Sequence, residues 1–168
     1  MEILIPVTII VILVIANGLF VAAEFAIVGA PRASIEHQAS QGSRLAQGVL
    51  RVLEDPKLQD RYIATTQVGI SVASLGLGMY GEHWLAGQIE PAFVRFETLG
   101  WIASHTVASV IAVTILTYLH IVIGEMVPKA LALQRADKTA LYVSPIISGL
   151  QYVIRPLVVT LNGVGNRL

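Results

Sequence analysis

A long apolar run near the start of the chain constrains its fold more than any other feature. The run extends from Ile3 to Ala30 and carries a single ionisable side chain, Glu24. A helix needs roughly 20 apolar residues to cross a bilayer, and this run is too long for the core of a signal peptide. Hydrophobic residues make up 55% of the chain and charged residues 13%, against about 25% charged in a typical soluble domain. We therefore expect one membrane domain over residues 1–168.

Two further stretches are candidates for membrane spans, at about 62–81 and 101–127. The first of them contains no charge but is rich in Thr, Ser and Gly, and small residues let helices approach closely in lipid. The segments at about 31–57 and 129–168 are amphipathic, with a break near Gly42, and should form juxtamembrane helices. A fourth span in the tail is the alternative. The predicted fold class is an all-α membrane protein with three transmembrane helices, spanning about 3–30, 62–81 and 101–127.

The basic residues predict the orientation. The first polar loop holds five Lys or Arg, the tail five, and the predicted linker at 82–100 only Arg95. Cytoplasmic loops carry the excess of Lys and Arg, so the first loop and the C-terminus should be cytoplasmic and the N-terminus outside. The formal net charge is zero, which gives no electrostatic footprint for nucleic acid. There is no cysteine, so disulfides and thiolate metal sites are excluded.

The stretch from Gly124 to Pro128 predicts a cation site. Proline has no N–H and displaces the carbonyl four residues before it, so the Gly124 carbonyl should be left free beside the Glu125 carboxylate. A free carbonyl in a membrane must find a partner or line a wet cavity. Oxygen ligands of these types suit a hard cation such as Mg²⁺, and an intramembrane acid indicates a functional site. The alternative is that Glu125 caps a helix at the membrane edge.

Polar groups on the other predicted spans extend this site. Asn17 and Glu24 share one helix face that should point into the bundle, although Asn17 could equally form an interhelical hydrogen bond. Ser71 and Ser74 lie about midway along the second span. His120 lies one turn before Gly124, where it could touch the site or join two helices.

Gln67 adds an amide to the same polar face of the second span. Further along, Gly76 and Gly78 should weaken this helix, so that it breaks or unwinds there as transporter helices do at their sites. Pro128 is the corresponding predicted break in the third span. Close packing of small residues is the alternative explanation for the glycines.

Three motifs in this order resemble the CorC/CNNM family of membrane proteins implicated in Mg²⁺ transport. They are Asn17–Ala26 (NGLFVAAEFA), Ala64–Ser71 (ATTQVGIS) and Gly124–Lys129 (GEMVPK). The resemblance implies a three-helix transmembrane domain that forms a homodimer in the lipid bilayer, here the bacterial inner membrane. It also implies Mg²⁺ export driven by Na⁺ entry. Members usually continue into a pair of ATP-binding cystathionine-β-synthase-type (CBS) domains in the cytoplasm, which the sequence lacks, so we expect an isolated membrane domain.

The same resemblance assigns ligands to the ion. Glu125 carries over as the metal-binding carboxylate. Gly124, Ser71 and Ser74 are the ligands expected beside it from their chemistry, although many members have Asn near Ser71 or Ser74. Many members have Ser where this chain has Ala22 or Ala23, so backbone carbonyls are expected to substitute there.

Two other classes of function compete with transport. A membrane-anchored Mg²⁺ sensor or scaffold would bind the ion and regulate another transporter. An intramembrane enzyme could use two carboxylates as acid and base, but the chain shows no nucleophile motif. Ion flux through the purified protein distinguishes a transporter from a sensor or scaffold.

Overall fold

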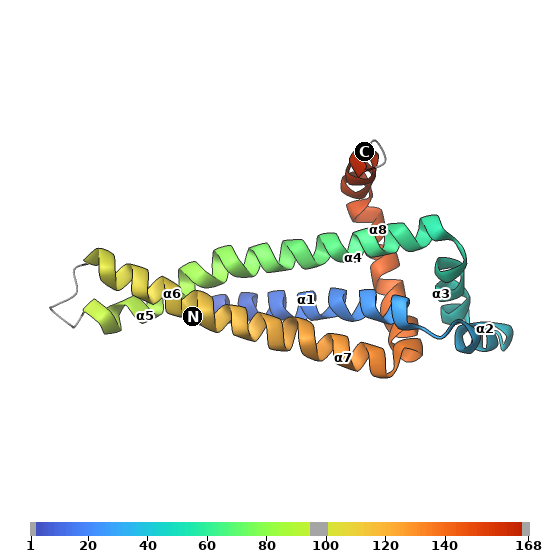
Figure 1. Ribbon diagram of the computed structural model, residues 1–168, viewed down its shortest axis with the longest axis horizontal. Helices are drawn as coiled ribbons and strands as arrows, with labels where there is room; N and C mark the ends of the chain where they lie inside the picture. The colour runs from blue at the N-terminus through green and yellow to red at the C-terminus, as the bar shows by residue number, and fades with distance from the viewer. Residues whose placement is uncertain (1–2, 95–100, 166–168) are drawn as a thin grey trace.

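The computed structural model describes residues 3–94 and 101–165, with side chains over residues 3–91 and 106–153. All secondary structure in these described residues is helical. Figure 1 shows long rods lying side by side, with shorter helices gathered at one end. The elements in chain order are α1 (Leu4–Gly29), α2 (Arg32–Ser40), α3 (Arg44–Glu54), α4 (Pro56–Gly76), η1 (Leu77–Gly81), α5 (Glu82–Val94), α6 (Trp101–Leu119), η2 (His120–Met126), α7 (Val127–Gln134) and α8 (Ala136–Gly165), where η marks a π-helix.

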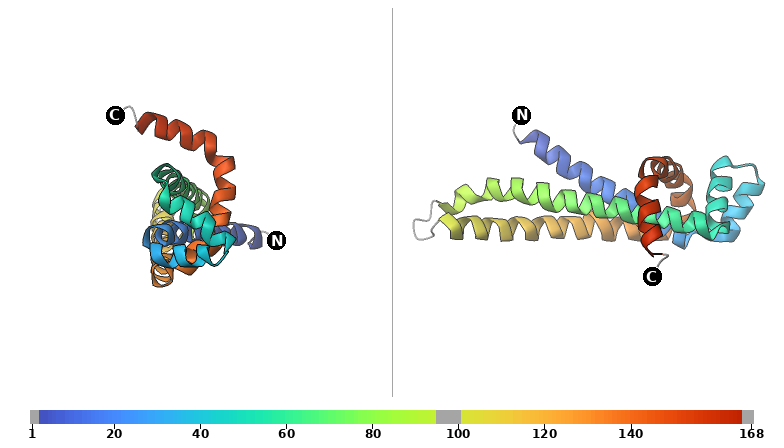
Figure 2. Two further views of the ribbon diagram at one scale, coloured as in Figure 1. Left: turned by 90° about the vertical axis from the view of Figure 1, so that its right-hand side faces the viewer. Right: turned by 90° about the horizontal axis from the view of Figure 1, so that it is seen from above.

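Two helices of the described chain are long and apolar enough to cross a membrane. They are Leu4–Gly29, which confirms the predicted first helix, and Thr106–Gln134, which combines most of α6 with η2 and α7. The predicted second span is helical but does not reach that apolar threshold, because Thr, Ser, Gln and Gly replace the large aliphatic residues. The right-hand view of Figure 2 shows the first half of α1 leaning away from the other rods.

The second rod is continuous from α4 through η1 into α5. The expectation of a linker at 82–100 was therefore wrong over Glu82–Val94. Its acidic residues suggested a loop, but Glu, Leu, Ala and Gln are good helix formers. The rod covers residues 56–94, about 58 Å at 1.5 Å per residue, which exceeds the roughly 30 Å hydrocarbon thickness of a bilayer.

Both predicted weak points are π-helical rather than unwound. Gly76 keeps right-handed helical angles, and η1 follows it directly. Around the proline, the N–H of Val127 donates to the carbonyl of Val122, five residues back. A π-turn shifts the hydrogen-bond register by one residue, so the helix passes through Pro128 and continues as α7.

Short helices form a platform at one end of the bundle. The predicted break between the first two is confirmed, because α2 ends at Ser40 and Gly42 has a φ of +89°. The long helix α8 crosses α1 and α4 instead of running along them (Figure 1). The fully buried Tyr62 hydroxyl lies 3.4 Å from Ser144 Oγ and joins α4 to α8. This arrangement agrees with the expectation of juxtamembrane helices at one face of a membrane domain.

Candidate cation site

A polar cavity of about 500 Å³ lies between α1, α4 and η2. Both predicted acids line it, together with hydroxyl, amide and imidazole groups. Its lining residues are Asn17, Val21, Glu24, Phe25, Gln67, Ile70, Ser71, Ser74, His120 and Glu125. Seven of the residues predicted for the site therefore meet in one hollow, although they come from three separate helices.

The two carboxylates have different surroundings. Glu24 is half-buried, and its Oε2 accepts a hydrogen bond of 3.3 Å from the Thr66 hydroxyl. Glu125 is exposed on the isolated protomer, and no hydrogen bond or ion pair holds it in the part of the chain that the structure describes. Its carboxylate is therefore available to a ligand. No group of three or more His, Asp or Glu side chains converges among the described residues, so a cation here would depend on these acids, neutral oxygens and water.

Four residues next to the carboxylates form a hydrogen-bonded network across three helices. Asn17, 1% exposed, donates through Nδ2 to the Gly124 carbonyl at 2.8 Å. The Ser74 hydroxyl donates to Asn17 Oδ1 at 3.4 Å. His120 Nε2 lies 3.2 Å from the same hydroxyl oxygen.

The donors in this network follow from the number of protons available. A serine hydroxyl has one proton, and Asn17 Oδ1 can only accept. When Ser74 donates its proton to Asn17 Oδ1, the contact with His120 requires a proton on His120 Nε2. The roles in that contact depend on the histidine tautomer. The Gly124 carbonyl, which Pro128 was expected to leave free, thus has a protein partner. Asn17 forms the interhelical hydrogen bond that was one of the two roles expected for it.

Glycine permits the close approach of these groups. A Cβ added at Gly124 would lie 3.0 Å from His120 Cδ2 and 3.2 Å from Asn17 Nδ2. On α1, a Cβ added at Gly18 would lie 3.0 Å from the Pro128 ring. The Asn-Gly pair of the first motif therefore meets the Gly-Glu-x-x-Pro motif of the third span directly.

Other predicted residues lie outside the main cavity. Ala23 is fully buried in the core cluster with Ile27 and Tyr62, and Ala22 packs against that cluster. Gly78 lines a smaller neighbouring hollow. Gly76 faces Leu13 of α1, with 3.3 Å between its added Cβ and Leu13 Cδ2.

Sequence reasoning missed several residues around the cavity. Val21 and Phe25 follow Asn17 at intervals of four on α1, so helical spacing could have found both. The Lys129 ammonium lies 4.2 Å from the centroid of the Phe25 ring, a cation–π contact that places a positive charge beside the cavity. No sequence pattern pairs these two residues, because they are brought together only by the packing of α1 on α7.

Comparison with known proteins identifies the family. Residues 8–168 match the cyclin M transmembrane N-terminal domain, CNNM. UPF0053 protein YhdT of Bacillus subtilis is 35% identical over 90% of this chain and 32% of its own length. UPF0053 protein YhdP of the same organism is 34% identical over 81% of this chain and 30% of its own length.

A third relative has a name that states an activity. The polyamine export protein of Haemophilus influenzae is 27% identical over 99% of this chain and 37% of its own length. The chain thus spans about a third of the length of these three relatives. Since the family match covers nearly the whole chain and all three motifs, the protein belongs to the CNNM family of transmembrane domains.

Proposed function

We propose that this chain is the membrane domain of a Mg²⁺ exporter of the bacterial inner membrane, driven by Na⁺ entry through alternating access. The cavity that Glu24 and Glu125 share is the observation that carries the proposal. Ionisable residues within spanning helices are costly and mark ion pathways. Mg²⁺ prefers six oxygens in an octahedron and dehydrates reluctantly, so a hollow of about 500 Å³ suits an ion that keeps part of its water.

Each group has a distinct role in this proposal. Glu125 binds the ion directly, because its carboxylate is exposed to the cavity. Ser71 and Ser74 supply neutral oxygens from α4, and the Gly124 carbonyl, which accepts from Asn17, lies next to Glu125 in the chain. Glu24 serves the coupling ion, with Gln67 and Asn17 on the same polar surface. The contribution of the Ala22 and Ala23 carbonyls stays a prediction.

The shape of the cavity supports a homodimer. Gln67, Ser71 and Glu125 are exposed on the protomer, so the cavity opens sideways, and lipid tails cannot satisfy polar groups. A second copy of the chain would cover this opening. In the whole protein we expect a cytoplasmic CBS pair beyond the membrane domain, with the N-terminus outside.

Calorimetry of the purified chain tests the ion ligand. Glu125→Gln keeps the side-chain shape but removes the charge, so Mg²⁺ affinity should fall at least about tenfold, as expected for the loss of a close charge contact. Glu36→Gln is the matched control, because Glu36 lies on α2 outside the cavity and should bind like the parent. Equal affinity in both variants would overturn the assignment of Glu125.

Flux into proteoliposomes, with Na⁺ and Mg²⁺ varied separately, tests transport. Glu24→Gln should reduce Na⁺-dependent Mg²⁺ flux more than it reduces Mg²⁺ affinity. Unchanged Na⁺ dependence would reject the coupling role. Tight Mg²⁺ binding without any flux would instead favour the sensor or scaffold function.

Polyamine export is a second candidate. The Haemophilus influenzae relative carries that name, and a cavity with two separate carboxylates could bind the two ends of a diamine. Putrescine in the same calorimetry distinguishes the candidates. Binding of putrescine that depends on both Glu24 and Glu125, without Mg²⁺ binding, would favour this function.

A further inference from the structure

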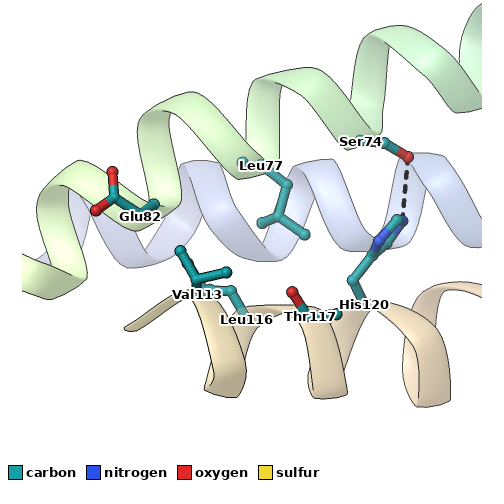
Figure 3. Close-up of a pocket in the computed structure, with 8 residues that line it drawn as sticks. Ser74, Leu77, Glu82, Val113, Leu116, Thr117 and His120 are labelled. Carbon is teal, nitrogen blue, oxygen red and sulfur yellow. Dashed lines mark hydrogen bonds between the residues drawn. The ribbon is translucent and has the colours of Figure 1, made fainter. Parts of the chain in front are cut away.

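A second hollow lies beside the main cavity, between α4, η1 and α6 (Figure 3). Its volume is about 110 Å³, well above the roughly 10–15 Å³ that one water needs. Apolar side chains form its sides, hydroxyl and imidazole groups add polar atoms, and Glu82 lies at the end opposite the Ser74–His120 contact (Figure 3). The lining residues are Ser74, Leu77, Gly78, Glu82, Val113, Leu116, Thr117 and His120.

The two hollows share Ser74 and His120. These residues form the hydrogen bond of 3.2 Å drawn at one end of the smaller hollow in Figure 3. Asn17 extends the same contact to α1 through its bond from Ser74. One chain of hydrogen bonds therefore crosses all three rods at the point where the two hollows meet.

The backbone changes at the same level. The π-segment η2 begins at His120, and η1 begins three residues after Ser74. π-Segments inside α-helices occur frequently at functional sites. Two of the three rods thus have an altered hydrogen-bond register at or near the residue that they contribute to this crossing, whereas α1, which contributes Asn17, is α-helical throughout.

Glu82 gives the smaller hollow the chemistry of a cation station. In the described chain no hydrogen bond or ion pair holds its carboxylate, and it lies on the first turn of α5. The Thr117 hydroxyl lines the same hollow from α6. Residues of η1, α5 and α6 line the hollow, and Figure 1 shows α5 at the end of the bundle away from α2 and α3.

We infer that the hollow at Glu82 is a second cation station on the transport path, separated from the Glu24–Glu125 cavity by the Asn17–Ser74–His120 crossing. This inference rests on the proposed transport function. A cation leaving the main cavity must break the Ser74–His120 contact and then meets the Glu82 carboxylate. The main cavity selects the cargo, and Glu82 attracts it toward the opposite end of the bundle.

Cysteine labelling tests the crossing without requiring transport. The chain has no cysteine, and a Cβ at Gly78 meets nothing within 4 Å, so Gly78→Cys fits. A membrane-impermeant maleimide should label it only from the α5–α6 side. Adding Ser74→Ala should open labelling from the α2–α3 side, whereas adding Ser71→Ala, which leaves the crossing intact, should not.

Two other open glycines calibrate the sides. Gly48→Cys on α3 and Gly87→Cys on α5 also meet nothing within 4 Å, and they should label from opposite sides. A Gly78→Cys that stays unlabelled from both sides, or that labels with the same sidedness in the parent and Ser74→Ala backgrounds, would overturn the inference. Thermal melting of each variant confirms that it is folded.

Binding and flux together test the station. Glu82→Gln should keep the Mg²⁺ binding that depends on Glu125, yet transport Mg²⁺ about tenfold more slowly, because the attracting charge on the path is lost. Thr117→Val should slow flux less, and Thr114→Val should not slow it, since Thr114 lies outside the hollow and its hydroxyl bonds to the Val110 carbonyl. Parental flux in Glu82→Gln would overturn the station.

The failure of the proposed function itself has a separate signature. A parent chain that neither binds nor moves Mg²⁺ rejects Mg²⁺ export. The labelling of Gly78→Cys would still report whether the crossing separates the two hollows.

Discussion

Asn17 and Gly124 show what one proline does to a helix packed against two others. Proline predicts a free carbonyl at Gly124, and the Asn17 amide satisfies it at 2.8 Å from another helix. Both residues are buried, so neither group has water as a substitute partner. A buried polar group left without a partner costs about 1–3 kcal/mol, which makes this contact a structural requirement of the site.

Asn17→Ala should therefore destabilise the fold by about 1–3 kcal/mol, because it leaves the buried Gly124 carbonyl without its side-chain partner. Thermal or denaturant unfolding in detergent measures the change. Thr114→Ala is the control, since it removes a side-chain hydrogen bond to a carbonyl at an exposed position and should have a much smaller effect. Equal stability of Asn17→Ala and the parent would show that water replaces the amide.

The sequence predicted which polar residues form the site, but it did not predict the hydrogen bonds between them. Asn17, Ser74 and His120 were expected on polar faces, and they line the same cavity. Their hydrogen-bond partners depend on the rotation and depth of three helices, which no spacing within one helix determines. The Lys129–Phe25 contact was missed for the same reason.

The hydrophobic pattern of the sequence predicted where the long helices lie. Asp55 lies between α3 and α4, and its carboxylate accepts from the Lys57 N–H at 2.8 Å at the start of α4, where Pro56 is the first residue. The pattern failed where glycine and proline suggested breaks, because π-turns absorb both features within a continuous helix. Such register shifts leave no composition signal of their own.

Close packing of α1 on α4 depends on one missing side chain. A Cβ at Gly69 would lie 2.5 Å from the Phe20 ring, far closer than carbon atoms approach. Gly69→Ala should therefore cost about 1–3 kcal/mol of stability by overpacking, measured by thermal unfolding. Gly48→Ala meets open space and should be neutral or stabilising, since alanine favours a helix by up to about 1 kcal/mol over glycine. A harmless Gly69→Ala would mean that the Phe20 ring moves aside and that the close approach of α1 and α4 does not depend on Gly69.

The single chain exposes both apolar and polar surfaces. Large apolar side chains such as Ile12, Val110 and Tyr118 are exposed on α1 and α6, as expected for surfaces that face a bilayer. The polar mouth of the cavity is exposed on the same bundle. The sequence pattern predicted a polar face that points into the bundle, but not that Gln67, Ser71 and Glu125 are exposed on the single chain, because their exposure depends on how the rods pack.

Lipid cannot hydrogen-bond the mouth of the cavity, so a second copy of the chain should cover it. A short bifunctional maleimide should therefore link two chains that carry Gln67→Cys, because Gln67 lies at the exposed mouth. Thr114→Cys, also exposed but outside both hollows, should stay unlinked under the same conditions. The native mass in lipid nanodiscs should equal two chains. A monomeric mass, or equal linking at both positions, would reject the proposal that a second copy of the chain covers the mouth of the cavity. The mouth would then contact water or another protein.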